Sequence, residues 1–200
     1  IVPVDKKLKP DLLVELISLY GWTQVLIFTK TKKGADTLAC FLDTKGLKAA
    51  AIHGDKNQAS RVKALSDFKN GITAILIATD VAARGLDIEK LQQVVNFDLP
   101  TIAENYIHRI GRTGRAGLSG QAVSLVSADE FIALHEIEVL IKRVLPRKII
   151  DGFEPNHNVP DSGLIIKPKK LSSSKKILGP KKNKGLDLQP RIPQSFSNRP

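Results

Sequence analysis

The stretch VLIFTKTKKGADTLACFLDTKG, residues 25–46, contains the local pattern that decides the fold. Its first residues are apolar in succession, which predicts a strand over Val25–Thr29 that is buried on both faces. The residues that follow have helical periodicity and predict a helix over Lys32–Thr44, with Gly46 where a helix C-cap is expected. A strand followed at once by a helix is the repeating unit of an α/β domain with a parallel sheet.

The same unit recurs along the chain. Further strands are predicted at Ala49–His53, Ala74–Thr79, Gln93–Phe97 and Ala122–Val126. Further helices are predicted at Asp11–Leu19, Asn57–Asn70, Ala103–Ile110 and Asp129–Val144, with Gly71 at another C-cap position. Short connections between alternating elements predict a doubly wound α/β domain that ends near Glu154, with a mostly parallel sheet and helices on both faces.

The charge is concentrated at the C-terminal end. The chain has 200 residues, 42% of them hydrophobic, which is enough for one domain with a core and some additional chain. Residues 161–200 hold 10 Lys and Arg against 2 Asp and Glu, so they carry +8 of the net charge of +11. The segment KPKKLSSSKKILGPKKNKG, residues 167–185, has too few apolar side chains to fold. We therefore expect a domain over residues 1–158 and a disordered basic tail over 159–200, which would attract polyanions.

Several classes of protein are excluded by composition. Cys40 is the single cysteine, so neither a disulfide framework nor a cysteine metal cluster is expected, and no metal site is predicted. The apolar runs are too short to cross a bilayer, and residues 1–10 do not form a secretory signal. We expect a cytoplasmic protein without membrane contact. The chain has no methionine, even at position 1, so we expect it to be part of a longer protein.

Polar residues follow three of the predicted strands. In open parallel sheets, ligands bind beyond the carboxyl ends of the strands. Here those ends carry Thr29–Thr31, His53–Asp55 and Thr79–Asp80. With Lys30, three neighbouring ends would bind successive phosphates of a nucleic acid strand through backbone N–H groups. Thr and Asp also serve as ordinary helix caps, which is the better explanation for any single end, and for the three together both explanations stand.

The segment YIHRIGRTGRAG, residues 106–117, holds three evenly spaced arginines, Arg109, Arg112 and Arg115. No Asp or Glu occurs between Asn105 and Ala128. A cluster of arginines without a local carboxylate, among small glycines, favours bidentate contact with phosphate oxygens. Isolated arginines more often form a salt bridge to another segment or stay solvated.

Two other groups of polar residues have both a functional and a structural explanation. In ATDVAARGLDI, residues 78–88, Gly85 permits a bend and Asp87 is suited to bind a ribose hydroxyl, or else to close the loop by pairing with Arg84. Gln58 and Arg61 share one face of a predicted helix, where they would brace a loop or touch a ligand. Residue types alone favour the structural explanation in both places.

The sequence also lacks the parts that hold a nucleotide. No GxxxxGK[ST] phosphate loop occurs, and no acidic strand end is suited to magnesium, since SADEF at 127–131 opens a helix. The arginines would suit the terminal phosphate of a nucleotide that another domain holds.

Five stretches of the sequence form one set: LIFTKTK at 26–32, HGDKNQASR at 53–61, ATDVAARGLDI at 78–88, VVNFDLP at 94–100 and HRIGRTGR at 108–115. Together they resemble the second RecA-like domain of DEAD-box RNA helicases over about residues 1–155. They are similar to that family's motif IV, its Q-x-x-R element, motif V, a further family signature and motif VI. AAIHGDKNQASR at 50–61 and GFEP at 152–155 resemble the RhlE-like bacterial branch.

The resemblance implies a role for each matching residue. Arg112 and Arg115 would be arginine fingers that reach the γ-phosphate of ATP, and His108 and Arg109 would tie the nucleotide site to the domain interface. Asp87, with Gly85 in the same motif, would bind the ATP ribose. The residues implied in contacts with the RNA backbone are Thr31, Gly54, Arg61 and Thr79, with Gln58 in support.

The resemblance also implies partners. They are ATP, whose Mg²⁺ an N-terminal RecA-like domain would hold, that domain itself, and RNA bound without sequence preference. The fragment alone would bind RNA weakly and would not hydrolyse ATP. A non-catalytic, stand-alone RNA-binding or helicase-docking module is the alternative, and a DNA helicase of a related group is a third possibility.

Overall fold

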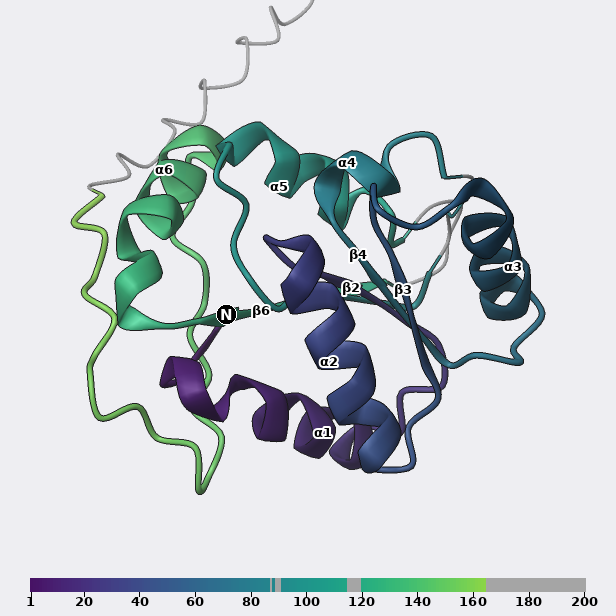
Figure 1. The fold of residues 1–200 in the computed structure, drawn as a ribbon. Coiled ribbons are helices and arrows are strands. Elements are labelled where there is room, and N and C mark those ends of the chain that lie inside the picture. Colours follow the sequence, from purple (N-terminus) through teal and green to yellow (C-terminus); the bar gives the residue numbers. More distant parts are fainter. Residues whose placement is uncertain (87, 89–90, 115–119, 165–200) are drawn as a thin grey trace, which may run out of the picture. The chain divides into compact units, whose positions relative to one another are not determined.

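The computed structural model describes residues 1–86, 88, 91–114 and 120–164, which lie in one compact unit (Figure 1). The strands are β1 (Val2–Pro3), β2 (Val25–Phe28), β3 (Ala49–Ile52), β4 (Ile75–Ala78), β5 (Gln93–Asn96) and β6 (Gln121–Val126). The α-helices are α1 (Lys9–Leu19), α2 (Lys32–Thr44), α3 (Gln58–Lys69), α4 (Asp80–Ala83), α5 (Ala103–Ile110) and α6 (Phe131–Ile141). Short 3₁₀ helices, η1 (Lys6–Leu8) and η2 (Ala128–Glu130), precede α1 and α6.

The six strands form one sheet in the order β1-β6-β5-β2-β4-β3, and every pairing is parallel. Phe28 of β2 lies beside Ala78 of β4, and Ala78 lies beside Ile52 of β3. The last residues of these three strands therefore lie level with one another. This register places the polar segments that follow the strands at one edge of the sheet, as the sequence predicts.

Helices cover both faces of the sheet and make three layers, which confirms the predicted fold class. On one face, α1 and α2 pack against alternate strand residues such as Val25, Ile27 and Val95 (Figure 1). On the other face, Phe68 of α3 packs with Leu26 and Phe28 of β2, and α5 and α6 pack near Val126. In the part of the chain that the structure describes, no helix is long and apolar enough to cross a membrane.

Local signals set most of the helix boundaries. Helix α2 spans the predicted residues, because the Thr31 hydroxyl caps its start and Gly46, at φ 78°, ends it in a left-handed conformation. The predicted helix over Asp129–Val144 is wrong at both ends. Residues 128–130 form η2, and Lys142 at φ 52° ends α6 after Ile141.

The chain after α6 ties the two ends of the domain together. It runs past the start of α1 and returns towards α6 (Figure 1). The Ile1 backbone donates to Pro146 O and accepts from Lys148 N, and Asp5 accepts from the Asn156 backbone and side chain. Val159 and Ser162 are also buried, so packing continues beyond residue 158. The predicted disordered tail lies largely outside the described residues, and the division at residue 158 stays a prediction.

Candidate functional site

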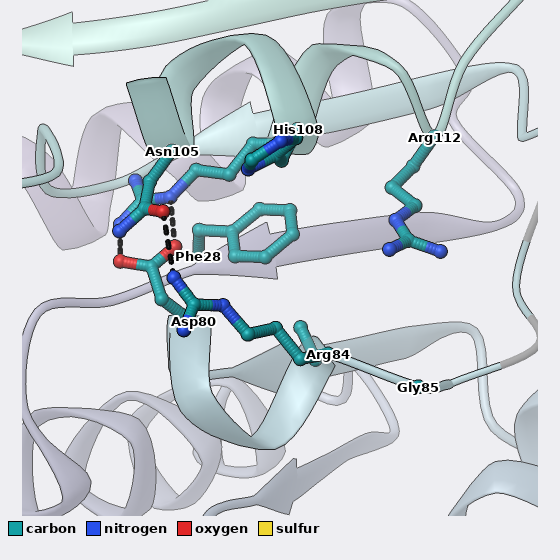
Figure 2. Close-up of a pocket in the computed structure, with 9 residues that line it drawn as sticks. Phe28, Asp80, Arg84, Gly85, Asn105, His108 and Arg112 are labelled. Carbon is teal, nitrogen blue, oxygen red and sulfur yellow. Dashed lines mark hydrogen bonds and ion pairs between the residues drawn. The ribbon is translucent and has the colours of Figure 1, made fainter. Parts of the chain in front are cut away.

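A pocket of about 270 Å³ opens at the carboxyl edge of the sheet, where α4 and α5 meet (Figure 2). It lies beside the end of β2 and is also lined by residues of the loop after α4 and of the segment after α5. The residues that line it are Phe28, Asp80, Ala83, Arg84, Gly85, Asn105, His108, Arg109 and Arg112. The pocket therefore brings together residues from the segments 78–88 and 106–117, which the sequence singles out independently.

Arg109 is not free to bind a phosphate. Its side chain is only 1% exposed, and its Nε and Nη2 donate to the two carboxylate oxygens of Asp80 at 2.6 and 2.8 Å. Its Nη1 donates to Asp98 O and to Asn96 Oδ1, and its Cζ lies 4.9 Å from the centre of the Phe28 ring. A buried guanidinium is tolerated only when its charge and its donors are matched in this way.

For Arg109 the structure shows the alternative that the sequence left open, a salt bridge to another segment. Its partner Asp80 lies 29 residues earlier, outside the window in which the sequence shows no acid. The bidentate pair joins α4 to α5. Arg109 thus fixes the position of the helix that leads to Arg112.

Arg112 has a different environment. Its Nη1 donates to the backbone carbonyl oxygens of Leu86 at 3.1 Å and Ile88 at 3.5 Å. Within the described part of the chain, carbonyl oxygens orient the Arg112 guanidinium and no carboxylate pairs with it; Asp87, between Leu86 and Ile88, lies outside that part. Figure 2 shows Arg112 reaching into the pocket apart from the cluster of Asp80, Arg84 and Asn105. A half-buried cation held by carbonyl dipoles is suited to meet an anion.

The remaining residues of the pocket are arranged around these two arginines. His108 is exposed and lines the pocket. Gly85 adopts φ 77°, a left-handed conformation that favours glycine. Arg84 Nη2 donates to Asn105 Oδ1 at 3.1 Å. Asp87 and Arg115 lie outside the described residues, so the ribose contact, the alternative Arg84–Asp87 pair and the second arginine finger stay predictions.

The three strand ends lie side by side, as predicted. Thr29 N donates to Ala78 O, and Thr79 N donates to Ile52 O. Thr31 caps α2 through Gly34 N at 2.9 Å, which confirms the structural explanation for that residue. Thr79 stands before α4 without a side-chain cap bond, so capping does not account for it. Lys30 and Thr79 line a second pocket of about 280 Å³, which the first pocket adjoins at Asp80, Arg84 and Asn105.

Gln58 and Arg61 are in the first turn of α3, where Asn57 is the N-cap. Gln58 is exposed, and Arg61 is half-buried with a buried Nε that has no hydrogen-bond partner in the described part of the chain. No hydrogen bond joins the two side chains there. That the two residues brace a loop or touch a ligand stays a prediction.

Sequence reasoning missed the groups that hold Arg109, which are Asp80, Asn96 and Asp98. A signal for them was present, because Arg109 lies three residues after Tyr106, on the inward face of the helix. An arginine on a buried face requires an acid, and Asp80 follows a buried strand directly.

The fold and this site define the class of protein: a RecA-like α/β domain with a basic pocket at the carboxyl edge of its sheet. The profile described as helicase conserved C-terminal domain matches residues 8–117, more than half of the chain, so the chain belongs to this family.

Named relatives are RNA helicases. The DEAD-box ATP-dependent RNA helicase CshA of Geobacillus kaustophilus is 46% identical over 144 residues, which are 72% of this chain and 31% of the relative. The ATP-dependent RNA helicase DDX4 of Mus musculus is 46% identical over 129 residues, which are 64% of this chain and 18% of the relative. The chain thus spans less than a third of the length of these curated relatives.

Solved structures agree with the fold. The chain resembles the Escherichia coli DEAD-box protein SrmB, solved bound to regulator of ribonuclease activity A, with a TM-score of 0.75 and 34% identity over 80% of this chain and 95% of that one. It resembles the C-terminal domain of the DEAD-box protein Dbp5 with a TM-score of 0.67 and 36% identity over 75% of this chain and 88% of that one.

Proposed function

We propose that this chain is the C-terminal half of an ATP-dependent RNA helicase. It would supply arginine fingers to an ATP site shared with a preceding RecA-like domain, and it would bind the RNA sugar-phosphate backbone. The observation that carries the proposal is the contrast between two arginines one helical turn apart. Arg109 is neutralised by Asp80, whereas Arg112 is held in the pocket by carbonyl oxygens alone among the described residues.

In the ATP site, Arg112 and Arg115 would contact the γ-phosphate when the two domains close. His108 would contact the facing domain, and Asp87 beside Gly85 would bind the ribose. Arg109 has a positioning role in this proposal, because its donors are occupied within the domain. The phosphate loop and the groups that hold Mg²⁺ would belong to the other domain, since this sequence has no GxxxxGK[ST] motif.

RNA would bind across the level strand ends, through Thr31, Gly54 and Thr79, with Arg61 and Gln58 at the start of α3. These groups suit phosphate and sugar oxygens, so binding would be independent of base sequence and sensitive to salt. The 2′-hydroxyl would distinguish RNA from DNA. The basic residues beyond 164 would add an electrostatic tether.

The names of the relatives support RNA as the substrate and ATP as the cofactor. The resemblance to the RhlE-like branch is also part of the proposal. It rests on residues 50–61 and 152–155, and the relatives cited above come from both bacteria and eukaryotes.

The experiment that tests the proposal measures ATP hydrolysis, with RNA, with DNA and without either, by the intact protein that contains this chain. We expect stimulation by RNA and its loss in Arg112→Ala. Arg143→Ala serves as the matched control, because Arg143 is exposed at the end of α6, away from the pocket. Stronger stimulation by DNA would contradict the RNA assignment. A start codon directly before Ile1 would favour the stand-alone module.

A further inference from the structure

An exposed ion pair stands between two of the strand ends. Lys32 is the first residue of α2, and its Nζ lies 2.6 Å from Asp55 Oδ1 in the loop after β3. The lysine side chain crosses over Gly54: a Cβ placed on Gly54 would lie 3.6 Å from Lys32 Cε and 3.7 Å from its Nζ. The ammonium group therefore lies above the exposed backbone of Gly54, between the ends of β2 and β3.

The same two strand ends also carry hydrogen-bond donors. The Thr31 hydroxyl accepts from Gly34 N at 2.9 Å, which leaves its own O–H available to donate. The Gly54 N–H has no acceptor in the described part of the chain, and no side chain at Gly54 blocks its approach. A hydroxyl, a backbone N–H and an ammonium carried by neighbouring strand ends suit the phosphate oxygens of one RNA strand.

Asp55 is held where it can occupy this position. Its backbone N–H donates to His53 Nδ1 at 3.4 Å, and His53 Nε2 lies 3.0 Å from Asp36 Oδ2 of α2. Asp36 also pairs with Lys56 at 2.9 Å, so the lysine next to Asp55 has its own partner. The loop is thus pinned to α2 on one side, and the Asp55 carboxylate is directed to Lys32.

We propose that Lys32 is a ligand of an RNA phosphate and that Asp55 is a built-in competitor, which occupies Lys32 until RNA displaces it. This inference rests on the proposed RNA binding. Both side chains are more than half exposed, at 54% and 67%, so the pair is weak and readily exchanged. A single phosphate ion that replaces Asp55 gains little binding free energy, because it exchanges one weak ion pair for another. An RNA strand that also contacts Thr31 and Thr79 gains more binding free energy, so the Lys32–Asp55 pair favours RNA over free phosphate.

The test uses the 200-residue chain and a fluorescent single-stranded RNA of uniform sequence, with binding measured over a range of salt concentrations. Asp55→Asn keeps the shape of the side chain and frees Lys32. We expect it to bind RNA up to about fivefold more tightly, the most that an exposed ion pair is worth. Its salt dependence should keep the wild-type slope, because Lys32 contacts one phosphate in the bound state of both proteins, and one contact on a single strand contributes about 0.7 to the slope. Lys32→Ala should weaken binding and flatten the salt dependence.

Two comparisons separate this mechanism from a general effect of charge. The gain from Asp55→Asn should disappear in a Lys32→Ala background. Asp11→Asn and Lys45→Ala, which break another exposed Lys–Asp pair at 3.6 Å between α1 and α2, should leave the salt dependence unchanged. If Asp55→Asn raised the RNA affinity equally with and without Lys32, or if Asp11→Asn raised it as much, the proposal that Asp55 competes with RNA for Lys32 would be wrong. A wild-type chain that binds no RNA would instead overturn the proposed function, and this inference with it.

Discussion

Removal of the Asp80 carboxylate should destabilise the domain far more than removal of a surface carboxylate. Asp80→Ala leaves the Arg109 guanidinium, 1% exposed, without the charge that neutralises it. Loss of one partner from a buried pair costs about 3–5 kcal/mol, because the other charge stays buried and uncompensated. We expect a cost at the lower end of this range, because Asp80 is 24% exposed and Arg109 keeps Asn96 Oδ1 and Asp98 O as acceptors.

Urea unfolding of the 200-residue chain, followed by circular dichroism, measures this loss. With an m value of about 2 kcal/mol/M, a loss of about 3 kcal/mol lowers the midpoint by about 1.5 M. Asp11→Ala is the control, since its pair with Lys45 at 3.6 Å is exposed and worth at most about 1 kcal/mol. If Asp80→Ala does not fold, Asp80→Asn keeps one acceptor and should show a smaller loss. Equal losses for Asp80→Ala and Asp11→Ala would refute the assignment of Arg109 as a buried, charge-matched link between α4 and α5.

Two further predictions concern the tail and the response to acid. Deletion of residues 165–200, which hold 10 Lys and Arg against one Asp, should weaken RNA binding far more at low salt than at high salt, and an equal loss at both would exclude the tether. Hydrogen bonds from Lys6 and Ser127 lower the pKa of Asp129 from 3.8 to about 2. Because the folded pKa lies below the unfolded one, this carboxylate stabilises the fold above about pH 4, and its contribution is lost as the pH falls towards 2. The free energies of unfolding of wild type and Asp129→Asn, measured from pH 5 to pH 2, should therefore converge at the acid end. A constant difference would contradict this.

The parts of the fold that local sequence determines were predicted well. Helix α2 has a capping threonine before it and a glycine after it, so both of its ends could be predicted. Strands β2 and β4 are short continuous apolar runs, as a parallel sheet buried on both faces requires. The strand β1 was missed because it has only two residues, and its pairing with β6 joins residues more than 120 positions apart.

The site was predicted only in part, because several of its contacts join residues that are far apart in the sequence. The motifs identified Arg112, His108 and Gly85, which the structure brings to one pocket. The partner of Arg109 could not be found within the helix, because Asp80 reaches it through the packing of α4 against α5. The interaction of Asp55 with Lys32 likewise depends on the alignment of β2 and β3 through β4 between them. Local sequence patterns identify the candidate site residues, and tertiary packing decides which of their charges are paired within the domain.

The most direct test of the central claim is RNA-stimulated ATP turnover by the intact protein with Arg112→Ala, beside wild type and Arg143→Ala. If Arg112 is an arginine finger, turnover should fall by about 10³–10⁵-fold, the range measured for such fingers in GTPases, while circular dichroism shows the domain still folded. Arg143→Ala should retain wild-type turnover. Near-normal turnover in Arg112→Ala would contradict the proposal that this chain completes an ATP site held by another domain.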